Sequence, residues 1–317
     1  MVSPKLADRV AQLAKNGRYE EAIALGERGL NDSPGRVALQ MRMARIFAGL
    51  SQFDRAYAHL DAAESASEGK NAKVLVERAR LDIYSGRGSG QQECLRAIEI
   101  NPQQTQFVYY VAGHQLQGDF LIIDSLQVVY SPIPKAGSTS LKSMFLEHRT
   151  TDHPESVVGG HQRFDGKRAR ADRLRLGDVD MENVYSFSVD RDDVERFESY
   201  FARNVVQGEA LRRAAGGRDK HFGLPTMPDI GYFAENLRAY RYVFADVQHH
   251  TLPARAFLHH DLAFYDDVFE LTELDRLADR LAEHTGMQFT VPHRLQSGTS
   301  RPSSVLSNAA RAAISTL

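Results

Sequence analysis

The chain has 317 residues, of which 42% are hydrophobic and 25% are charged, and its formal net charge is −2. This length suits two domains with separate cores, and the balanced charge gives no global reason to expect nucleic acid or an anionic membrane as a partner. The single cysteine, Cys94, excludes an intramolecular disulfide and fits a reducing compartment. The chain shows neither a signal peptide nor a run of about 18 apolar residues, so we expect a cytoplasmic protein without a transmembrane helix.

The first hundred residues carry an internal repeat with a period of 34 residues. Tyr19 and Phe53 lie one period apart, and so do Ala22 and Ala56. Small residues at such positions let paired helices approach closely, and larger residues fill the groove between repeats. A helix–turn–helix unit of this length is typical of tetratricopeptide repeats. The expected repeats span residues 3–36, 37–70 and 71–104.

We therefore predict an all-α tetratricopeptide-repeat module over residues 1–104, followed by a connector over residues 105–120. The third repeat is degenerate, because Arg87 and Gly90 stand where the first two repeats have an aromatic residue and an alanine. The alternative is a plain helical bundle without superhelical stacking. Residues 107–111 are apolar and aromatic, and this short run fits a last helix as well as a strand.

The pattern changes in the second part of the chain, where short β-rich runs alternate with helical stretches. The runs cover residues 121–124, 126–130 and 184–189. Alternation of strand, loop and helix predicts an α/β domain with a mostly parallel sheet over residues 121–317.

A strand, a tight loop and a helix follow one another in residues 128–141. Gly137 allows a close approach of the backbone to a ligand. Ser138, Thr139 and Ser140 stand at the expected helix start, where N–H groups and the helix dipole favour an anion, and Lys135 adds a positive charge. This predicts a phosphate-binding loop similar to a P-loop, although the nucleotide-triphosphatase pattern itself is absent. The alternative is a helix that is merely capped by hydroxyl groups.

A second strand ends near Arg191, and a helix follows it. Val194, Phe197 and Phe201 have helical spacing and would face the core, whereas Ser199 falls outside this stripe. An arginine with a nearby hydroxyl suits a second, terminal phosphate. A surface arginine held in a salt bridge is the alternative.

Together these two segments resemble the sulfotransferases that depend on PAPS (3′-phosphoadenosine 5′-phosphosulfate), especially the carbohydrate-modifying, heparan 2-O-type branch. The loop at residues 134–140 matches closely. The second segment keeps Arg191, Asp192, Arg196 and Ser199 at the family spacing. Asp193 stands in place of the usual proline, and Asp190 precedes the arginine where an apolar residue is common. The resemblance covers residues 121–317 and leaves the repeats outside.

The resemblance also implies a catalytic base. Residues 159–164 contain a Gly-His-x-x-Phe pattern, and its histidine, His161, matches the family's base. A neutral imidazole suits proton abstraction from an acceptor hydroxyl at pH 7. His153 and Glu155 are the alternative bases, and a structural role for His161 also stays open. The basic stretch at residues 163–175 is either an acceptor or donor surface or a solvated helix face.

The function implied by the resemblance is sulfuryl transfer from PAPS to an acceptor hydroxyl, on a saccharide, without a metal. The implied catalytic residues are Lys135, Ser138 and His161. The implied donor-binding residues are Lys135, Ala136, Gly137, Ser138, Thr139, Ser140, Arg191 and Ser199. A peptide tyrosine or a small-molecule hydroxyl is the alternative acceptor, and the repeat groove could take a protein partner. Outside the enzymes, the alternative is an adaptor that binds PAP, the desulfated product, without catalysis.

Overall fold

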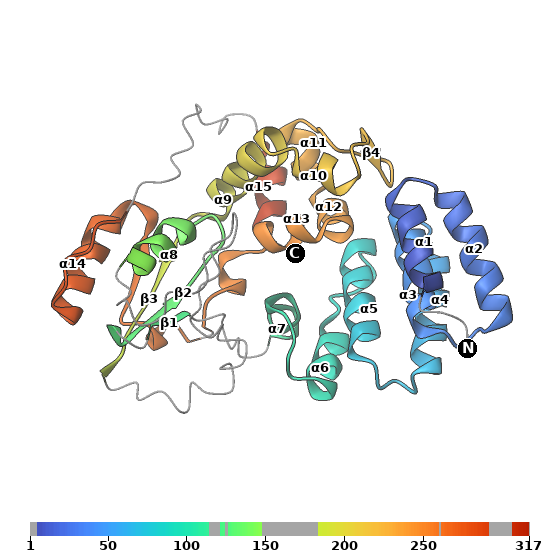
Figure 1. Ribbon diagram of the computed structural model, residues 1–317, viewed down its shortest axis with the longest axis horizontal. Helices are drawn as coiled ribbons and strands as arrows, with labels where there is room; N and C mark the ends of the chain where they lie inside the picture. Colours follow the sequence, from blue (N-terminus) through green and yellow to red (C-terminus); the bar gives the residue numbers. More distant parts are fainter. Residues whose placement is uncertain are drawn as a thin grey trace. The chain divides into compact units, whose positions relative to one another are not determined.

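The structure, a computed structural model, describes residues 5–113, 121–123, 126–147, 183–259, 261–291 and 306–316 (Figure 1). The chain divides into two compact units. The first contains residues 1–114, 200–252 and 302–317, and the second contains residues 115–199 and 253–301. Among the described residues, no helix is both long and apolar enough to cross a membrane.

The N-terminal part of the first unit consists of consecutive helices joined by short turns. They are α1 (Lys5–Lys15), α2 (Tyr19–Asp32), α3 (Val37–Gly49), α4 (Phe53–Ala66), α5 (Ala72–Ser85), α6 (Gln91–Ile100) and α7 (Gln106–Ala112). Each of the three expected repeats contains one pair of these helices. The run at residues 107–111, which fits a helix or a strand by sequence, is helical, and Gly113 ends this helix in the left-handed conformation with φ 62°.

Small residues allow these helices to pack closely. Ala22, Ala56 and Ala97 are each 0% exposed. A Cβ atom added at Gly26 would overlap the side chain of Met43, and one at Gly29 would overlap Leu6. The contacts between α2 and its neighbours therefore depend on residues that have little or no side chain.

The rest of the first unit comes from distant parts of the sequence. Its elements are a π-helical segment (Phe201–Gln207), α10 (Ala210–Ala214), β4 (Lys220–His221), β5 (Leu224–Pro225), α11 (Ile230–Glu235), α12 (Leu237–Val243), α13 (Ala245–Thr251) and α15 (Asn308–Ile314). The ring of Tyr242 on α12 stacks on Tyr84 of α5 with 4.8 Å between centroids. Tyr242 also belongs to the apolar core formed by the N-terminal helices.

An ionic cluster around the buried Glu77 joins α12 to the N-terminal helices. Glu77 of α5 is 1% exposed and accepts hydrogen bonds from Arg45 at 2.6 Å and from the Tyr242 hydroxyl at 2.9 Å. Burial alone would raise the pKa of Glu77, but the charges of Arg80 and Arg45 hold it below its usual value. These contacts explain why residues 200–252 group with the N-terminal helices rather than with the remainder of the expected α/β domain at 121–317.

The second unit is built on a four-stranded sheet in the order β1-β2-β3-β6. The strands are β1 (Leu121–Ile123), β2 (Val128–Ser131), β3 (Tyr185–Asp190) and β6 (Asp267–Glu270). β2, β3 and β6 run parallel, and β1 pairs with β2 in the antiparallel direction. The described α-helices are α8 (Ser138–Glu147), α9 (Asp193–Tyr200, whose last residue is grouped with the first unit) and α14 (Leu274–Thr285), and short 3-10 helices cover Ala254–Ala256, Leu262–Phe264 and Leu271–Glu273. The expectation of a mostly parallel sheet is therefore confirmed.

Apolar residues on the central strands form the core of this unit. All four residues of β2 are buried, as the central strand of a covered parallel sheet requires. Tyr130 of β2 stacks on Phe187 of β3 with 4.9 Å between centroids, and Phe145 of α8 packs against both rings.

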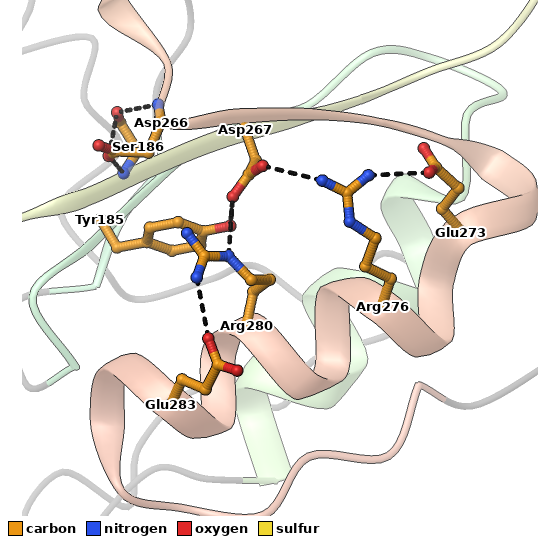
Figure 2. A network of polar contacts seen from close by, with 8 residues as sticks. All are labelled: Tyr185, Ser186, Asp266, Asp267, Glu273, Arg276, Arg280 and Glu283. Carbon is orange, nitrogen blue, oxygen red and sulfur yellow. Dashed lines mark hydrogen bonds and ion pairs between the residues drawn. The ribbon is translucent and has the colours of Figure 1, made fainter.

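A polar network fixes α14 against β6 (Figure 2). The Asp267 carboxylate accepts hydrogen bonds from the Tyr185 hydroxyl at 2.8 Å, from Arg280 at 3.1 Å and from Arg276 at 3.3 Å. Nearby, the Asp266 carboxylate accepts from both the backbone N–H and the hydroxyl of Ser186. Asp266, just before β6, therefore holds the neighbouring strand β3, and Asp267, the first residue of β6, holds β3 and the helix that follows.

Candidate phosphate-binding site

The loop between β2 and α8 contains two residues in the left-handed conformation. Lys135 has φ 67° and Gly137 has φ 75°. Glycine adopts this conformation without a steric penalty, whereas a lysine does not. A Cβ atom at position 137 would also lie 2.9 Å from Cδ1 of Leu271, so both backbone and space favour glycine there.

The first turn of α8 offers the N–H groups that the sequence pattern predicts for a phosphate. The Leu141 N–H donates to the Gly137 carbonyl at 3.1 Å, which begins the i→i−4 pattern of the helix. The N–H groups of Ser138, Thr139 and Ser140 precede it and belong to the turn where an anion is favoured. Thr139 is exposed and Ser138 is half-buried, whereas Ser140 and Ala136 are buried.

A second strand–turn–helix segment contains Arg191. β3 ends at Asp190, and Asp192 caps α9 by accepting hydrogen bonds from the N–H groups of Val194 at 3.0 Å and Glu195 at 3.1 Å. Arg191 therefore lies in the short turn between β3 and the capped helix, as expected from the sequence.

The sheet brings these two segments together. Because β2 and β3 are parallel neighbours, with Ser131 opposite Ser188, their carboxyl ends lie at the same edge. Nη1 of Arg191 donates to the Lys135 carbonyl at 3.3 Å, and Nε of Arg196 donates to the Pro134 carbonyl at 2.9 Å. In open α/β sheets, this edge is where ligands bind.

Carboxylates also lie in this site. Nε of Arg191 forms an ion pair with Oε2 of Glu195 at 3.1 Å. Asp190 accepts a hydrogen bond from the Arg191 N–H at 2.7 Å, and burial raises the pKa of its carboxyl group. An incoming phosphate would therefore compete with Glu195 for the Arg191 guanidinium.

Several predicted site residues are not joined to this cluster. Ser199 lies on α9, about 9 Å along the helix axis from Asp193, and in the described part of the chain no hydrogen bond links it to Arg191. His161, its alternatives His153 and Glu155, and the basic stretch at 163–175 lie outside the described residues.

The structure adds a contact at Ser131 that the sequence does not predict. The Tyr265 hydroxyl lies 2.8 Å from the Ser131 hydroxyl at the end of β2 and accepts the His259 N–H at 2.8 Å. Tyr265 lies between residues 264 and 267, just before β6, and weakly fits the resembling family, but nothing local to it in the sequence indicates its contact with Ser131.

The donor set fits a phosphate ester at the β2–α8 loop. It combines a lysine, N–H groups at a helix start and a glycine where a side chain would meet Leu271. The Arg191 guanidinium can bind a second phosphate once its ion pair with Glu195 is broken. No family model, curated protein or solved structure matches this chain.

Proposed function

We propose that the chain is a PAPS-dependent sulfotransferase that transfers a sulfuryl group to an acceptor hydroxyl on a saccharide. The observation that carries the proposal is the meeting of the Lys135 loop and Arg191 at one edge of the sheet, joined by the hydrogen bond from Arg191 to the Lys135 carbonyl. Two cationic groups on neighbouring strand ends suit a ligand with two separate phosphates, as PAPS has.

PAPS supplies the activated sulfuryl group. Lys135 and the N–H groups of residues 137–140, which form a P-loop-like element, hold the 5′-phosphate and stabilise charge on the leaving oxygen. One such contact is typically worth about 10²–10³ in rate. Ser138 binds the same phosphate, and Ala136 contributes its backbone to the loop that surrounds this phosphate. Arg191 and Ser199 hold the 3′-phosphate, and His161 accepts the proton of the acceptor hydroxyl.

The proposal includes tetratricopeptide repeats at the N-terminus. Its support is that each 34-residue period contains one helix pair, with Ala22, Ala56 and Ala97 fully buried at the helix contacts. Such repeats present surfaces to partner proteins or to a protein acceptor.

An arrayed transfer assay tests the proposal. The protein is incubated with PAPS carrying a labelled sulfuryl group and with saccharide, peptide-tyrosine and phenol acceptors in parallel. Label transferred to a saccharide supports the proposal as stated. Transfer only to peptides or phenols would show that the acceptor is not a saccharide. No transfer to any acceptor would refute the proposed sulfotransferase activity.

The ion pair between Arg191 and Glu195 favours a second candidate, an adaptor that binds PAP without catalysis. Because the Glu195 carboxylate already pairs with the Arg191 guanidinium, the affinity of this arginine for the donor's phosphate is lower. This candidate predicts PAP binding by a protein that transfers label to none of the acceptors in the same assay.

A further inference from the structure

Arg196 connects three parts of the second unit from a buried position. Its side chain is 2% exposed. Its Nε donates to the Pro134 carbonyl at 2.9 Å, its Nη1 lies 2.8 Å from Oδ1 of Asp193, and its Cζ lies 5.5 Å from the centre of the Phe257 ring. The guanidinium therefore links α9, the β2–α8 loop and the segment that follows residue 253.

Asp193 holds this guanidinium in place. Its Oδ1 also accepts the Ala254 N–H at 2.8 Å, so that one carboxylate oxygen fixes both the arginine and the backbone of the neighbouring turn. Burial lowers the pKa of Arg196, and the charge of Asp193 opposes that effect. A buried charge of this kind needs its partner, because an uncompensated one is strongly unfavourable.

The link to Pro134 controls the direction of the loop's N–H groups. In a trans peptide the carbonyl and the following N–H point in opposite directions. Fixing the Pro134 carbonyl on Arg196 therefore turns the Lys135 N–H away from that arginine. Arg191 holds the next carbonyl, that of Lys135, and so the two arginines together define the backbone around a residue with φ 67°. Successive N–H groups around a left-handed residue form concave anion-binding sites.

We infer that Asp193 and Arg196 form a positioning ion pair that orients the β2–α8 loop for phosphate binding, an inference that rests on the proposed function. Asp193 is the residue that departs from the proline of the resembling family, and proline has no carboxylate to hold Arg196. In this chain the departure supplies the anchor of the loop.

Charge and positioning predict opposite effects for Asp193→Asn. Removing a carboxylate near an anion site strengthens anion binding if charge alone matters. If the carboxylate positions Arg196, its loss weakens PAP binding roughly tenfold, the order expected when a charge-assisted contact that holds the binding loop is lost. The amide of this variant would still offer an oxygen to the Ala254 N–H, which favours retention of the fold.

The experiment is a titration of PAP into the wild type, Asp193→Asn, Arg196→Lys and the double variant, with thermal unfolding of each. Glu195→Gln is the matched control, because it removes a nearby carboxylate on the same helix that pairs with Arg191 instead; it is expected to bind PAP more tightly. We expect both single variants to bind more weakly and the double variant to bind no worse than the weaker single one.

The outcomes separate the two proposals. A wild type that does not bind PAP refutes the proposed function. A wild type that binds PAP, with Asp193→Asn binding equally or more tightly, refutes only the positioning role. If Arg196→Lys does not fold, the comparison between Asp193→Asn and Glu195→Gln still shows whether loss of the Asp193 carboxylate weakens or strengthens PAP binding.

Discussion

At Lys135 the backbone adopts the left-handed conformation, with φ 67°, which costs a residue with a Cβ atom roughly 1–2 kcal/mol. Local strain of this kind is often found at functional sites, where surrounding contacts maintain it. Here the contacts are the hydrogen bonds of Arg191 and Arg196 to the Lys135 and Pro134 carbonyls. The same residue carries the side chain that the proposed mechanism needs.

Replacement of Lys135 by alanine tests this residue directly. Alanine also has a Cβ atom, so the backbone cost is similar and the fold is expected to persist. We expect sulfuryl transfer to fall by at least about 10²-fold, because one electrostatic contact to the leaving group is lost. Lys142→Ala, on α8 beyond the loop, serves as the control and is expected to retain activity. Full activity of Lys135→Ala would show that this lysine has no role in sulfuryl transfer.

The partly buried carboxyl group of Asp190 is expected to make the stability of the protein depend on pH. Burial raises its pKa above the usual value, so the folded state favours the protonated form. The stability that protonated Asp190 contributes is therefore complete below its pKa in the unfolded chain, about 3.9. It is lost as the pH rises through its higher pKa in the folded protein. We expect Asp190→Asn, which cannot ionise, to unfold at a higher temperature than the wild type at pH 7 and at a similar temperature near pH 3. A variant that is less stable at both pH values would contradict this account.

At the scale of elements, the β4–β5 hairpin docks on the N-terminal helices through aromatic residues. The Tyr19 hydroxyl lies 3.0 Å from Nδ1 of His221 and accepts the Phe222 N–H at 2.7 Å. The rings of Tyr19 and Phe222 stack with 4.6 Å between centroids. The repeat pattern predicts Tyr19 as a groove-filling residue, and the structure gives it this hairpin as a neighbour.

His221 makes this docking sensitive to acid. Burial, together with the charge of Arg218, lowers its pKa from 6.5 to about 4. The folded state therefore favours neutral His221. The resulting stability is complete above pH 6.5 and is lost as pH falls towards about 4, by roughly 2–3 kcal/mol. Chemical denaturation across this range should show a smaller loss for His221→Gln than for the wild type; equal losses would assign the effect to other groups.

The sequence predicts the N-terminal helix pairs well, because their signal is local and periodic. An alanine and an aromatic residue recur 34 residues apart in the first two repeats, and helices form where that period places them. The short apolar run at 107–111 could not be assigned, since a few apolar residues fit a helix and a buried strand equally. The strand–loop–helix segments of the site were also visible, because each is contiguous in sequence.

Contacts between distant residues were not visible in the sequence. Nothing in the chain links Arg196 to Pro134, or Tyr265 to Ser131, until the strands are paired. For the same reason, the sequence did not reveal that Asp193, an apparent departure from a family pattern, accepts two hydrogen bonds. Pairwise geometry of this kind depends on the fold rather than on local composition.

At the scale of the whole molecule, the first unit combines segments from both ends of the chain around a buried charge. Glu77 is surrounded by Arg45, Arg80 and the hydroxyl of Tyr242, which lies 165 residues away in the sequence. The surface of α5 that meets Tyr242 is therefore covered by the chain's own α12. Any protein that binds the N-terminal helices would have to use their remaining surface.

Tyr242→Phe tests this long-range link. It removes a hydrogen bond to a buried carboxylate and is expected to lower the free energy of unfolding by about 2 kcal/mol, measured by chemical denaturation. Tyr84→Phe is the control: the stacked ring remains, and the change should stay within about 0.5 kcal/mol. Equal effects of the two variants would show that the hydrogen bond from Tyr242 to Glu77 adds no measurable stability.

Calorimetric titration of the wild type with PAP, with 5′-AMP as the control, tests the proposed two-phosphate site at the carboxyl ends of β2 and β3. PAP carries the additional 3′-phosphate that Arg191 is proposed to bind. We predict PAP binding at roughly micromolar concentration, corresponding to about −8 kcal/mol, and much weaker binding of 5′-AMP. Equal affinity for the two ligands, or binding of neither by a folded sample, would show that this edge of the sheet does not bind two phosphates.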